Sequence, residues 1–283
     1  MQTTQDARLK AVLESAVRHL HAFAREVNLT PGEWLQAIQF LTRVGETCSP
    51  VRQEFILLSD VVGLSTLVNT LHDATALEAG TATSLLGPFF REDAPRLPLG
   101  AQISQRDKSE EILLWGSVRS AAGQGIPHAS VTVWQTSSSG SYDMQEGGRG
   151  IDYRGIFQSD EQGNYHLRTV RPLGYFIPMD GPVGALVRAQ GREGCRPAHI
   201  HFLISAPGFR ELVTALYFRD RYLETDVVFG ASPSLIVSEQ SNDPQAPLQG
   251  LVSVRFDFTL ARAGSVDSAS GRVGADPTKL APN

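Results

Sequence analysis

Hydrophobic positions recur at helical spacing in the first third of the chain. Residues 10–27 carry apolar side chains three or four positions apart along one stripe, the pattern of an amphipathic helix. Residues 30–33 (Thr-Pro-Gly-Glu) combine a capping threonine, a proline at the first helical position and a glutamate three residues after the cap, which predicts the start of a second helix. Residues 55–71 are almost wholly apolar and predict a third, central helical segment. We therefore expect an α-helical subdomain over residues 1–90.

The pattern changes after Gly87 and Pro88. Short runs rich in β-branched and aromatic residues follow, separated by Gly, Asp and Asn, and strands of this length indicate an antiparallel β-sandwich. We expect this sandwich over residues 91–262, in an α+β fold that is mainly β. The clearest runs are residues 112–118, 129–134, 163–170, 199–205 and 252–260. Residues 263–283 are rich in Gly, Ser, Ala and Pro and predict a flexible tail.

Composition narrows the function classes. The chain has 283 residues, 41% hydrophobic and 19% charged, with a formal net charge of −5, so no basic field favours nucleic acid as a partner. No apolar run approaches the roughly 20 residues of a membrane span, and the N-terminus does not resemble a signal peptide. Two distant cysteines, Cys48 and Cys195, argue against a disulfide framework and a thiolate metal site. We expect a cytoplasmic protein without a membrane partner.

Two histidines and two tyrosines are the candidate chemistry. In a strand, His199 and His201 point to the same face, where two imidazoles suit one metal ion; the alternative is two polar residues on a solvated face. Tyr142 lies in a loop after a strand, and Tyr175 lies in residues 171–178 (Arg-Pro-Leu-Gly-Tyr-Phe-Ile-Pro). A phenol with a pKa near 10 binds a trivalent cation as a phenolate far better than a weak Lewis acid, so tyrosine with histidine favours ferric iron over zinc. Taken singly, each tyrosine also fits the edge of a core.

Together with their neighbours, these residues form a known pattern. Over residues 55–260 the chain resembles the intradiol ring-cleaving dioxygenases, the family of the catechol, chlorocatechol and hydroxyquinol 1,2-dioxygenases. The motifs that carry the resemblance, in the family's order, are residues 87–89 (Gly-Pro-Phe), 125–129 (Gly-Ile-Pro-His-Ala), 131–135 (Val-Thr-Val-Trp-Gln), 140–142 (Gly-Ser-Tyr), Tyr175 with 178–182 (Pro-Met-Asp-Gly-Pro), and 191–192 (Gly-Arg) leading into 196–202 (Arg-Pro-Ala-His-Ile-His-Phe).

The resemblance implies one ferric, non-haem iron per chain and an aromatic diol or triol with O₂ as substrates. Tyr175 would leave the iron when substrate binds and accept a substrate proton, while Arg196 would stabilise negative charge on the ring. Arg196 could instead form a surface salt bridge. At Ala215, relatives often carry glutamine or another polar residue, which puts the role of that group in doubt. The implied iron ligands are Tyr142, Tyr175, His199 and His201.

Substrate choice depends on the wall of the site. Residues 55–60, 84–91 and 176–184 look closest to hydroxyquinol 1,2-dioxygenases, which convert 1,2,4-trihydroxybenzene to maleylacetate. Asp60 could accept a hydrogen bond from a third ring hydroxyl, unless it faces a helix end or solvent. Catechol or chlorocatechol is the alternative substrate. The implied substrate-binding residues are Leu57, Asp60, Leu85, Pro88, Val227 and Val228.

Other classes stay open at this point. A zinc or copper hydrolase or oxidase could use His199 and His201, and a non-catalytic β-sandwich carrier could hold them without chemistry. Visible absorption by an iron(III)-phenolate bond would distinguish these classes of protein, because zinc and empty proteins are colourless. The resemblance also implies a homodimer through the N-terminal helices, with a phospholipid bound between them in some members. The same apolar faces could instead pack within one subunit.

Overall fold

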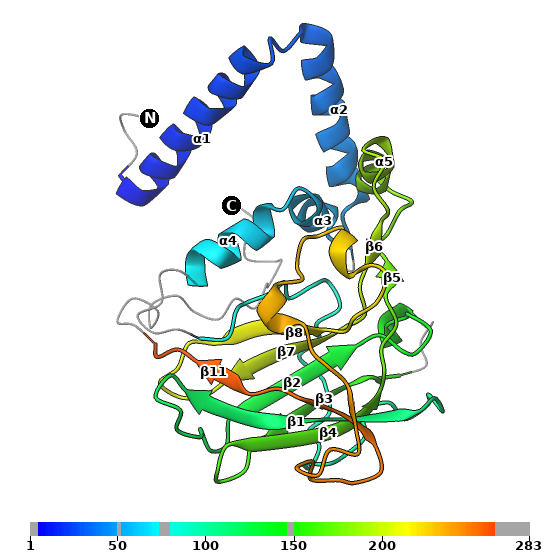
Figure 1. Ribbon diagram of the computed structural model, residues 1–283. Helices are drawn as coiled ribbons and strands as arrows, with labels where there is room; N and C mark the ends of the chain where they lie inside the picture. The colour runs from blue at the N-terminus through cyan, green and yellow to red at the C-terminus, as the bar shows by residue number, and fades with distance from the viewer. Residues whose placement is uncertain (1–4, 50–51, 74–79, 146–149, 264–283) are drawn as a thin grey trace. The chain divides into compact units, whose positions relative to one another are not determined.

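The computed structural model describes residues 5–49, 52–73, 80–145 and 150–263 (Figure 1). The chain forms two compact units, Met1–Thr47 and Cys48–Asn283. The sequence-based boundary at residue 90 stays a prediction, and residues 264–283 of the expected tail lie outside the described residues.

The first unit holds helices α1 (Ala7–Glu26) and α2 (Pro31–Thr47). Asp6 caps α1 by accepting the backbone N–H groups of Arg8 and Leu9 at 2.8 and 3.0 Å. At the start of α2, Glu33 accepts the Thr30 N–H at 2.9 Å while Thr30 Oγ1 accepts the Glu33 N–H at 3.3 Å. This reciprocal arrangement is the capping box predicted from the sequence, which is confirmed.

The apolar segment at residues 55–71 forms two helices, α3 (Glu54–Val61) and α4 (Leu64–Asp73). The chain turns between them at Gly63, whose φ of +77° is a conformation that glycine adopts readily. The prediction of one central segment is wrong, because Phe55, Ile56 and Val68 are about half exposed. Within the described ranges no single helix is long and apolar enough to cross a membrane; only the bent pair α3–α4 meets that test, by length and composition.

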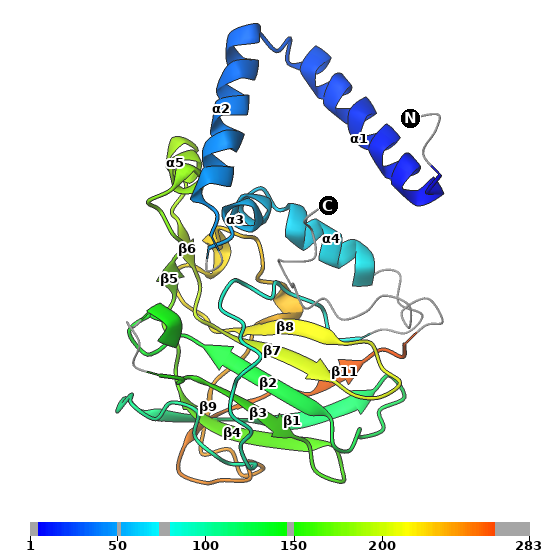
Figure 2. The ribbon, with the colours of Figure 1, turned by 180° about the vertical axis from the view of Figure 1, so that it is seen from behind.

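Two sheets make up most of the second unit (Figures 1 and 2). The first sheet contains β1, which pairs with β4, β10 and β11, and β10 also pairs with β9; the second runs β3-β2-β7-β8. β1 is parallel to β10 and β11, and the other pairs are antiparallel. The strands are β1 (Glu111–Ser120), β2 (Ser130–Gln135), β3 (Arg154–Gln158), β4 (Asn164–Val170), β7 (His199–Ser205), β8 (Leu212–Tyr217), β9 (Gln240–Ser241), β10 (Val252–Arg255) and β11 (Phe258–Leu260).

Shorter elements connect and flank the sheets. A two-stranded ribbon pairs β5 (Tyr175–Phe176) with β6 (Cys195–Arg196), and helix α5 (Pro182–Ala189) lies between these strands in sequence. The 3₁₀ turns in the described ranges are η1 (Asp143–Gln145), η2 (Leu223–Thr225) and η3 (Pro233–Leu235).

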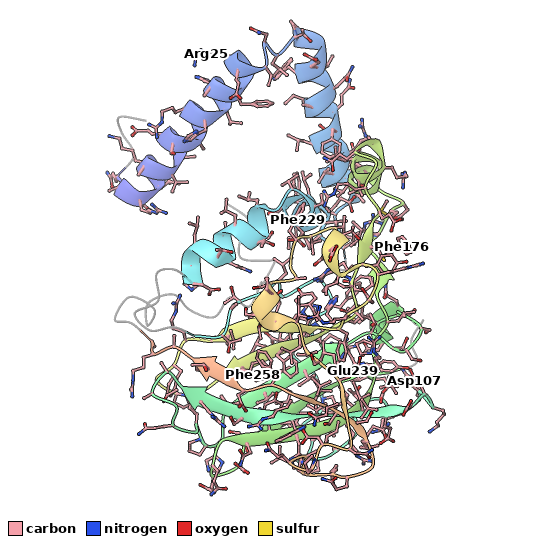
Figure 3. All side chains as sticks on the ribbon, viewed as in Figure 1. Arg25, Asp107, Phe176, Phe229, Glu239 and Phe258 are labelled. Atoms are coloured by element: carbon pink, nitrogen blue, oxygen red, sulfur yellow. The ribbon has the colours of Figure 1, made fainter. Side chains whose placement is uncertain are left out.

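The main core lies between the two sheets. Leu114 and Phe258 from the first sheet and Val133, Phe202 and Leu216 from the second belong to one buried cluster (Figure 3). Alternation along a strand then sends the intervening residues of β2, β7 and β8 to the opposite face of the second sheet. The prediction of a mainly β, α+β fold with a sandwich and N-terminal helices is confirmed. The sandwich is not wholly antiparallel as predicted, because β1 pairs in parallel with β10 and β11.

Candidate active site

His199 and His201 point away from the sandwich core, on the opposite face of β7 from Phe202. The register of the sheet sets their neighbours: Trp134 of β2 lies opposite His201, and Ala215 and Tyr217 of β8 lie opposite His201 and His199. The Trp134 and His201 rings stack with centroids 4.9 Å apart and planes 5° from parallel. Both imidazoles are therefore held at fixed positions on a rigid sheet.

The two imidazoles direct one nitrogen each towards a common point. The Nε2 atoms lie 3.1 Å apart, and His199 Nδ1 lies 2.6 Å from the backbone oxygen of Pro197. Because a carbonyl can only accept, Nδ1 carries the proton and Nε2 of neutral His199 presents a lone pair. Burial, followed by the Arg196 charge, holds the pKa of both histidines well below the usual value, so both are neutral at pH 7.

Two tyrosines from separate segments of the chain complete the cluster. Tyr142 immediately precedes η1 and Tyr175 lies on β5; their ring centroids are 5.5 Å apart, and Tyr175 lies 5.8 Å from His199. The Tyr142 side chain is fully buried, stacks on Phe89 at 4.2 Å, and its hydroxyl has no hydrogen-bond partner among the described residues. Burial and the nearby Tyr175 phenol raise the pKa of Tyr142 well above its usual value.

This donor set fits a trivalent metal ion. An orphaned buried hydroxyl is costly unless something binds it, and only a strong Lewis acid would deprotonate a phenol whose pKa is raised. Among the described residues, no group of three or more His, Cys, Asp or Glu side chains could hold a metal ion, so a metal here needs the phenols. Two neutral imidazoles and two phenols suit ferric iron better than zinc or copper.

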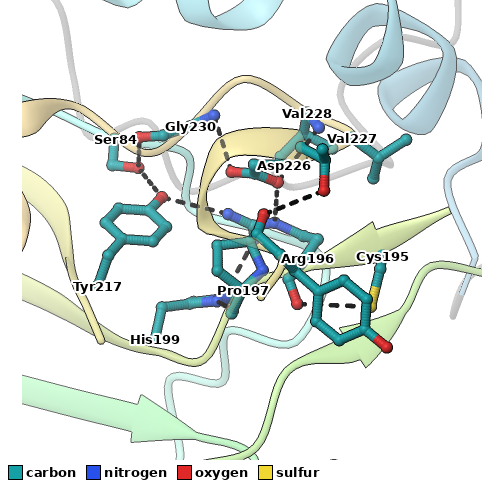
Figure 4. A network of polar contacts seen from close by, with 12 residues as sticks. Ser84, Cys195, Arg196, Pro197, His199, Tyr217, Asp226, Val227, Val228 and Gly230 are labelled. Carbon is teal, nitrogen blue, oxygen red and sulfur yellow. Dashed lines mark hydrogen bonds and ion pairs between the residues drawn. The ribbon is translucent and has the colours of Figure 1, made fainter. Parts of the chain in front are cut away.

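Arg196 joins the cluster through the β5–β6 ribbon, where it pairs with Tyr175 in register. Its side chain is 3% exposed, so the surface salt bridge considered from the sequence is wrong. Nη1 lies 3.2 Å from His199 Nε2, Nη2 donates to Tyr217 Oη at 3.2 Å, and Nε approaches Asp226 Oδ1 at 3.4 Å (Figure 4). A permanent positive charge thus lies directly beside the histidines.

A second buried arginine supports the loop of Tyr142. Arg154 Nε donates to Asp143 Oδ2 at 2.8 Å, its Nη2 donates to the other carboxylate oxygen, and its Nη1 donates to the Phe89 carbonyl at 2.9 Å. Asp143 follows Tyr142 in sequence, and Phe89 stacks on the Tyr142 ring. One guanidinium therefore connects the Tyr142 loop to the segment of Phe89, whose ring stacks on the tyrosine.

A cavity of about 560 Å³ opens beside the cluster, between α3, α4 and residues 85–90. Gly87 of its wall has a φ of +71°, and a Cβ there would lie 3.4 Å from His201 Nε2, so glycine leaves room next to the imidazole. Three of the six predicted substrate residues, Asp60, Leu85 and Pro88, line the cavity. Leu57, Val227 and Val228 are not among its lining residues, and both valines are buried.

Asp60 is 7% exposed and lies on α3 at this cavity. Burial raises its pKa, opposed by the Ser65 hydroxyl and by the charge of Arg196. It faces the cavity rather than open solvent. Ala215, the predicted departure from the family, is fully buried opposite His201 and brings no polar group to the site.

Sequence reasoning missed the residues that support the cluster. Tyr217, Asp226, Asp143 and Arg154 are buried polar groups that contact Arg196 or the Tyr142 loop. Tyr217 follows Ala215 by two positions, which places it on the same strand face, but only the register shows that it lies opposite His199. Asp226 and Arg154 gave no signal at a recognisable spacing.

Comparison with known proteins accounts for this arrangement. Residues 86–262 match a family model described as dioxygenase, and residues 6–80 match the catechol dioxygenase N terminus. The chain belongs to the intradiol ring-cleavage dioxygenase family. Members of this family are iron-dependent enzymes that cleave aromatic diols with O₂, and this chain is accordingly an iron-dependent dioxygenase.

Several members with named substrates are close in sequence and structure. The 6-chlorohydroxyquinol 1,2-dioxygenase of Cupriavidus pinatubonensis is 44% identical over 91% of this chain and 92% of its own length. The hydroxyquinol 1,2-dioxygenase of a Rhizobium species is 40% identical over 93% and 92%. The solved hydroxyquinol 1,2-dioxygenase of Pseudomonas putida superposes with a TM-score of 0.86 at 39% identity, over 93% of this chain and 94% of that one.

Proposed function

We propose that this dioxygenase cleaves hydroxyquinol, 1,2,4-trihydroxybenzene, between its two adjacent hydroxyl-bearing carbons. Both atoms of O₂ enter the product, so C₆H₆O₃ and O₂ give C₆H₆O₅, maleylacetate (3-hydroxy-cis,cis-muconate), without an added reductant. What carries the proposal is one juxtaposition: two tyrosines and two neutral histidines converge beside a cavity whose wall holds a buried carboxylate. The relatives named for hydroxyquinols support the choice of substrate.

Tyr142, Tyr175, His199 and His201 would hold one non-haem iron(III) per chain. When bound, this ion supplies a site that chelates two adjacent ring hydroxyls and draws electron density from the ring, so that O₂ attacks carbon. The fixed positions of the imidazoles on β7 and the clamped loop of Tyr142 orient three of these four donors.

Tyr175 is the donor suited to accept a substrate proton. It lies on a two-residue strand, and its ring is adjacent to both Tyr142 and His199. A phenolate oxygen there can take the proton of a ring hydroxyl, while Arg196 in the neighbouring strand stabilises negative charge that develops on the ring and its oxygens. These are the catalytic roles we assign to Tyr175 and Arg196.

Asp60 would select the third hydroxyl. A buried carboxylate that accepts a ring hydroxyl gains a charge-assisted hydrogen bond, whereas an unsubstituted catechol leaves it without that partner. Leu85 and Pro88 would supply the apolar walls of the same cavity. Leu57, Val227 and Val228 are the other substrate residues that the family resemblance implies. Catechol and chlorocatechol are then the poorer substrates.

The decisive experiment is a visible spectrum of the purified protein with iron analysis, before and after anaerobic addition of 1,2,4-trihydroxybenzene or catechol, followed by turnover in air. We expect about one iron per chain, a broad band that shifts on substrate binding, and a much larger kcat/KM for the triol. Tyr142→Phe should remove much of the band, whereas Tyr165→Phe, in the core with its hydroxyl on the Phe256 carbonyl, should keep it. A colourless zinc protein, or equal kcat/KM values, would contradict the proposal.

We also propose that the protein is a homodimer through α1 and α2, with a phospholipid between the helices. Support comes from α1, whose apolar side chains lie along one stripe although no residue of the helix is buried. Light scattering of the full chain and of a variant with Leu20→Glu and Phe23→Glu tests this: we expect a dimer that becomes a monomer. A monomeric parent protein would refute it.

A further inference from the structure

The Arg196 guanidinium has three partners of different chemistry, a carboxylate, a phenol and an imidazole (Figure 4). A buried cation is tolerated where its charge and its N–H groups are satisfied. The orientation of the guanidinium therefore depends on what its nitrogens contact.

One of the three contacts is incompatible with iron at the site. Under the proposed function, on which this inference rests, the Nε2 lone pair of His199 belongs to the metal. That lone pair cannot also accept the Arg196 Nη1 hydrogen at 3.2 Å. The guanidinium is then held by Asp226 and Tyr217, and Nη1 is free to face the ring.

Asp226 is itself held firmly in place. Its Oδ1 accepts the Val228 N–H at 3.3 Å and its Oδ2 accepts the Gly230 N–H at 3.0 Å. A Cβ added at Gly230 would lie 2.7 Å from Tyr217 Oη and 3.3 Å from Asp226 Oδ2, so the space around the carboxylate is full. The Asp226 carboxylate therefore cannot move with Arg196, and its position determines where the Nε edge of the guanidinium lies.

Tyr217 provides the second support. Its hydroxyl accepts from Arg196 Nη2 and lies 2.8 Å from Ser84 Oγ, which in turn lies 3.5 Å from the Gly230 carbonyl. The phenol is neutral, so it fixes direction without balancing charge. The only carboxylate within ion-pair distance of Arg196 among the described residues is Asp226.

We propose that Asp226 is a positioning residue for the ring-cleavage reaction. It does not line the cavity. It acts through Arg196, by pairing with Nε so that the planar guanidinium keeps Nη1 directed at the site and Nη2 on Tyr217. Without the carboxylate, Arg196 would keep its charge, but its Nη1 would no longer be directed at the site.

The first measurement uses the metal-free protein labelled with ¹⁵N-arginine, where the Arg196 Nε–H signal is identified by its absence in Arg196→Lys. We expect a slowly exchanging signal that Asp226→Asn shifts and exposes to exchange. The matched control is Asp243→Asn, since Asp243 is also a buried carboxylate that accepts a backbone N–H, from Gln245 at 2.9 Å, and it forms no ion pair among the described residues. This control should leave the Arg196 signal unchanged.

The second measurement is turnover per bound iron with 1,2,4-trihydroxybenzene. We expect Asp226→Asn to lower kcat ten- to a hundredfold, to change KM less than threefold, and to keep iron content and the resting absorption band. An unchanged kcat, or loss of iron with normal turnover in the molecules that retain it, would overturn the proposal, because the latter is the result of a purely structural role.

Failure of the proposed function is distinguishable from failure of this inference. If the parent protein binds no iron, the proposed function falls, while the Nε–H signal still decides whether Asp226 holds the guanidinium. If Asp226→Asn gives no folded protein, hydrogen exchange in the parent protein tests the proposal instead. An Arg196 Nε–H that exchanges as fast as those of exposed arginines overturns the proposal, and one that is protected from exchange supports it.

Discussion

Two buried arginine–aspartate pairs flank the same cluster of tyrosines and histidines, but they are built differently. Arg154 directs Nε and Nη2 to both oxygens of Asp143 and Nη1 to a backbone carbonyl. Arg196 reaches Asp226 with Nε alone, at 3.4 Å, and directs its other two nitrogens to Tyr217 and His199. The first guanidinium uses its nitrogens to connect segments of the fold, whereas the second keeps donors directed at the site.

The difference separates a pair that connects two segments of the fold from a pair whose guanidinium also contacts the cluster. The Arg154–Asp143 pair is bidentate, and its side chains are 2% and 0% exposed. Such a pair gains geometric specificity as well as energy, and the third guanidinium nitrogen donates to the Phe89 carbonyl. Arg196 contacts its carboxylate through Nε alone, so its other two nitrogens can exchange one partner for another. Asp60 extends the comparison, because this buried aspartate forms no ion pair among the described residues and faces the cavity.

The largest effect is expected from removing the first pair. Arg154→Met leaves the Asp143 carboxylate buried without its cation, and breaking a buried pair in this way costs about 3–5 kcal/mol. We expect the free energy of unfolding of the metal-free protein, measured in urea, to fall by that amount.

The control for this variant is Arg91→Met, which breaks the exposed pair of Arg91 with Asp93, where the two side chains are 29% and 61% exposed. Exposed pairs contribute up to about 1 kcal/mol. Equal losses in the two variants would show that the Arg154 pair does not stabilise the fold, and the contrast between the two buried pairs would disappear.

The second variant, Arg196→Leu, tests the other side of the comparison. We expect the protein to keep its iron and to lose turnover per iron at least about a hundredfold, equivalent to about 2.7 kcal/mol, the scale of one lost transition-state donor. Iron analysis and steady-state kinetics on the same sample measure both. Loss of iron with normal turnover in the remaining loaded molecules would place Arg196 with Arg154 as a structural residue.

The local parts of this site could be predicted from the sequence. His199 and His201 share a strand face because strand periodicity is two, and the capping box at Thr30 and Glu33 depends only on spacing along one helix. Both are properties of a short stretch of chain. The family motifs added the two tyrosines. Tyr142 lies in a loop and Tyr175 lies on a two-residue strand, so neither belongs to a periodic pattern.

Contacts between distant segments could not be predicted in this way. Tyr217 lies beside His199 because of the β7–β8 register, and Asp226 reaches Arg196 across 30 residues of sequence. Residues 55–71 show a different limit. Their hydrophobicity indicates that they avoid water somewhere, but the bend at Gly63 and the exposure of Phe55 depend on what packs around them.

The next test measures substrate preference and concerns Asp60, the third buried aspartate in the comparison. Asp60→Ala removes the acceptor for a third hydroxyl, so the ratio of kcat/KM for 1,2,4-trihydroxybenzene to that for catechol should fall roughly ten- to a hundredfold, about 1.5–3 kcal/mol. Most of the change should come from the triol. Asp180→Ala, which removes a carboxylate that is 76% exposed, should leave the ratio unchanged. An unaltered ratio in Asp60→Ala would remove Asp60 from the recognition of substrate.

The smallest effect is a pH dependence of that preference. Burial raises the pKa of Asp60 because it disfavours the charged form. As the pH falls from neutral, Asp60 therefore takes up a proton before exposed carboxyl groups do, and it is ionised at the alkaline end. A hydrogen bond to a charged acceptor contributes about 1.5–3 kcal/mol and one to a neutral acceptor about 0.5–1.5 kcal/mol. The preference for the triol should be largest at the alkaline end and narrow several-fold in acid.

The ratio of the two specificity constants is the quantity to measure, because loss of iron in acid lowers both constants equally and cancels. Ionisation of the substrates does not cancel, so the control is Asp60→Asn, which has a similar shape and no titrating group. The pH profile of the parent ratio divided by that of Asp60→Asn should decline on the acid side at a pH above the usual carboxyl range near 4. A flat quotient down to that range would show that the charge of Asp60 plays no part in selecting the third hydroxyl, even if its removal by alanine changes the ratio.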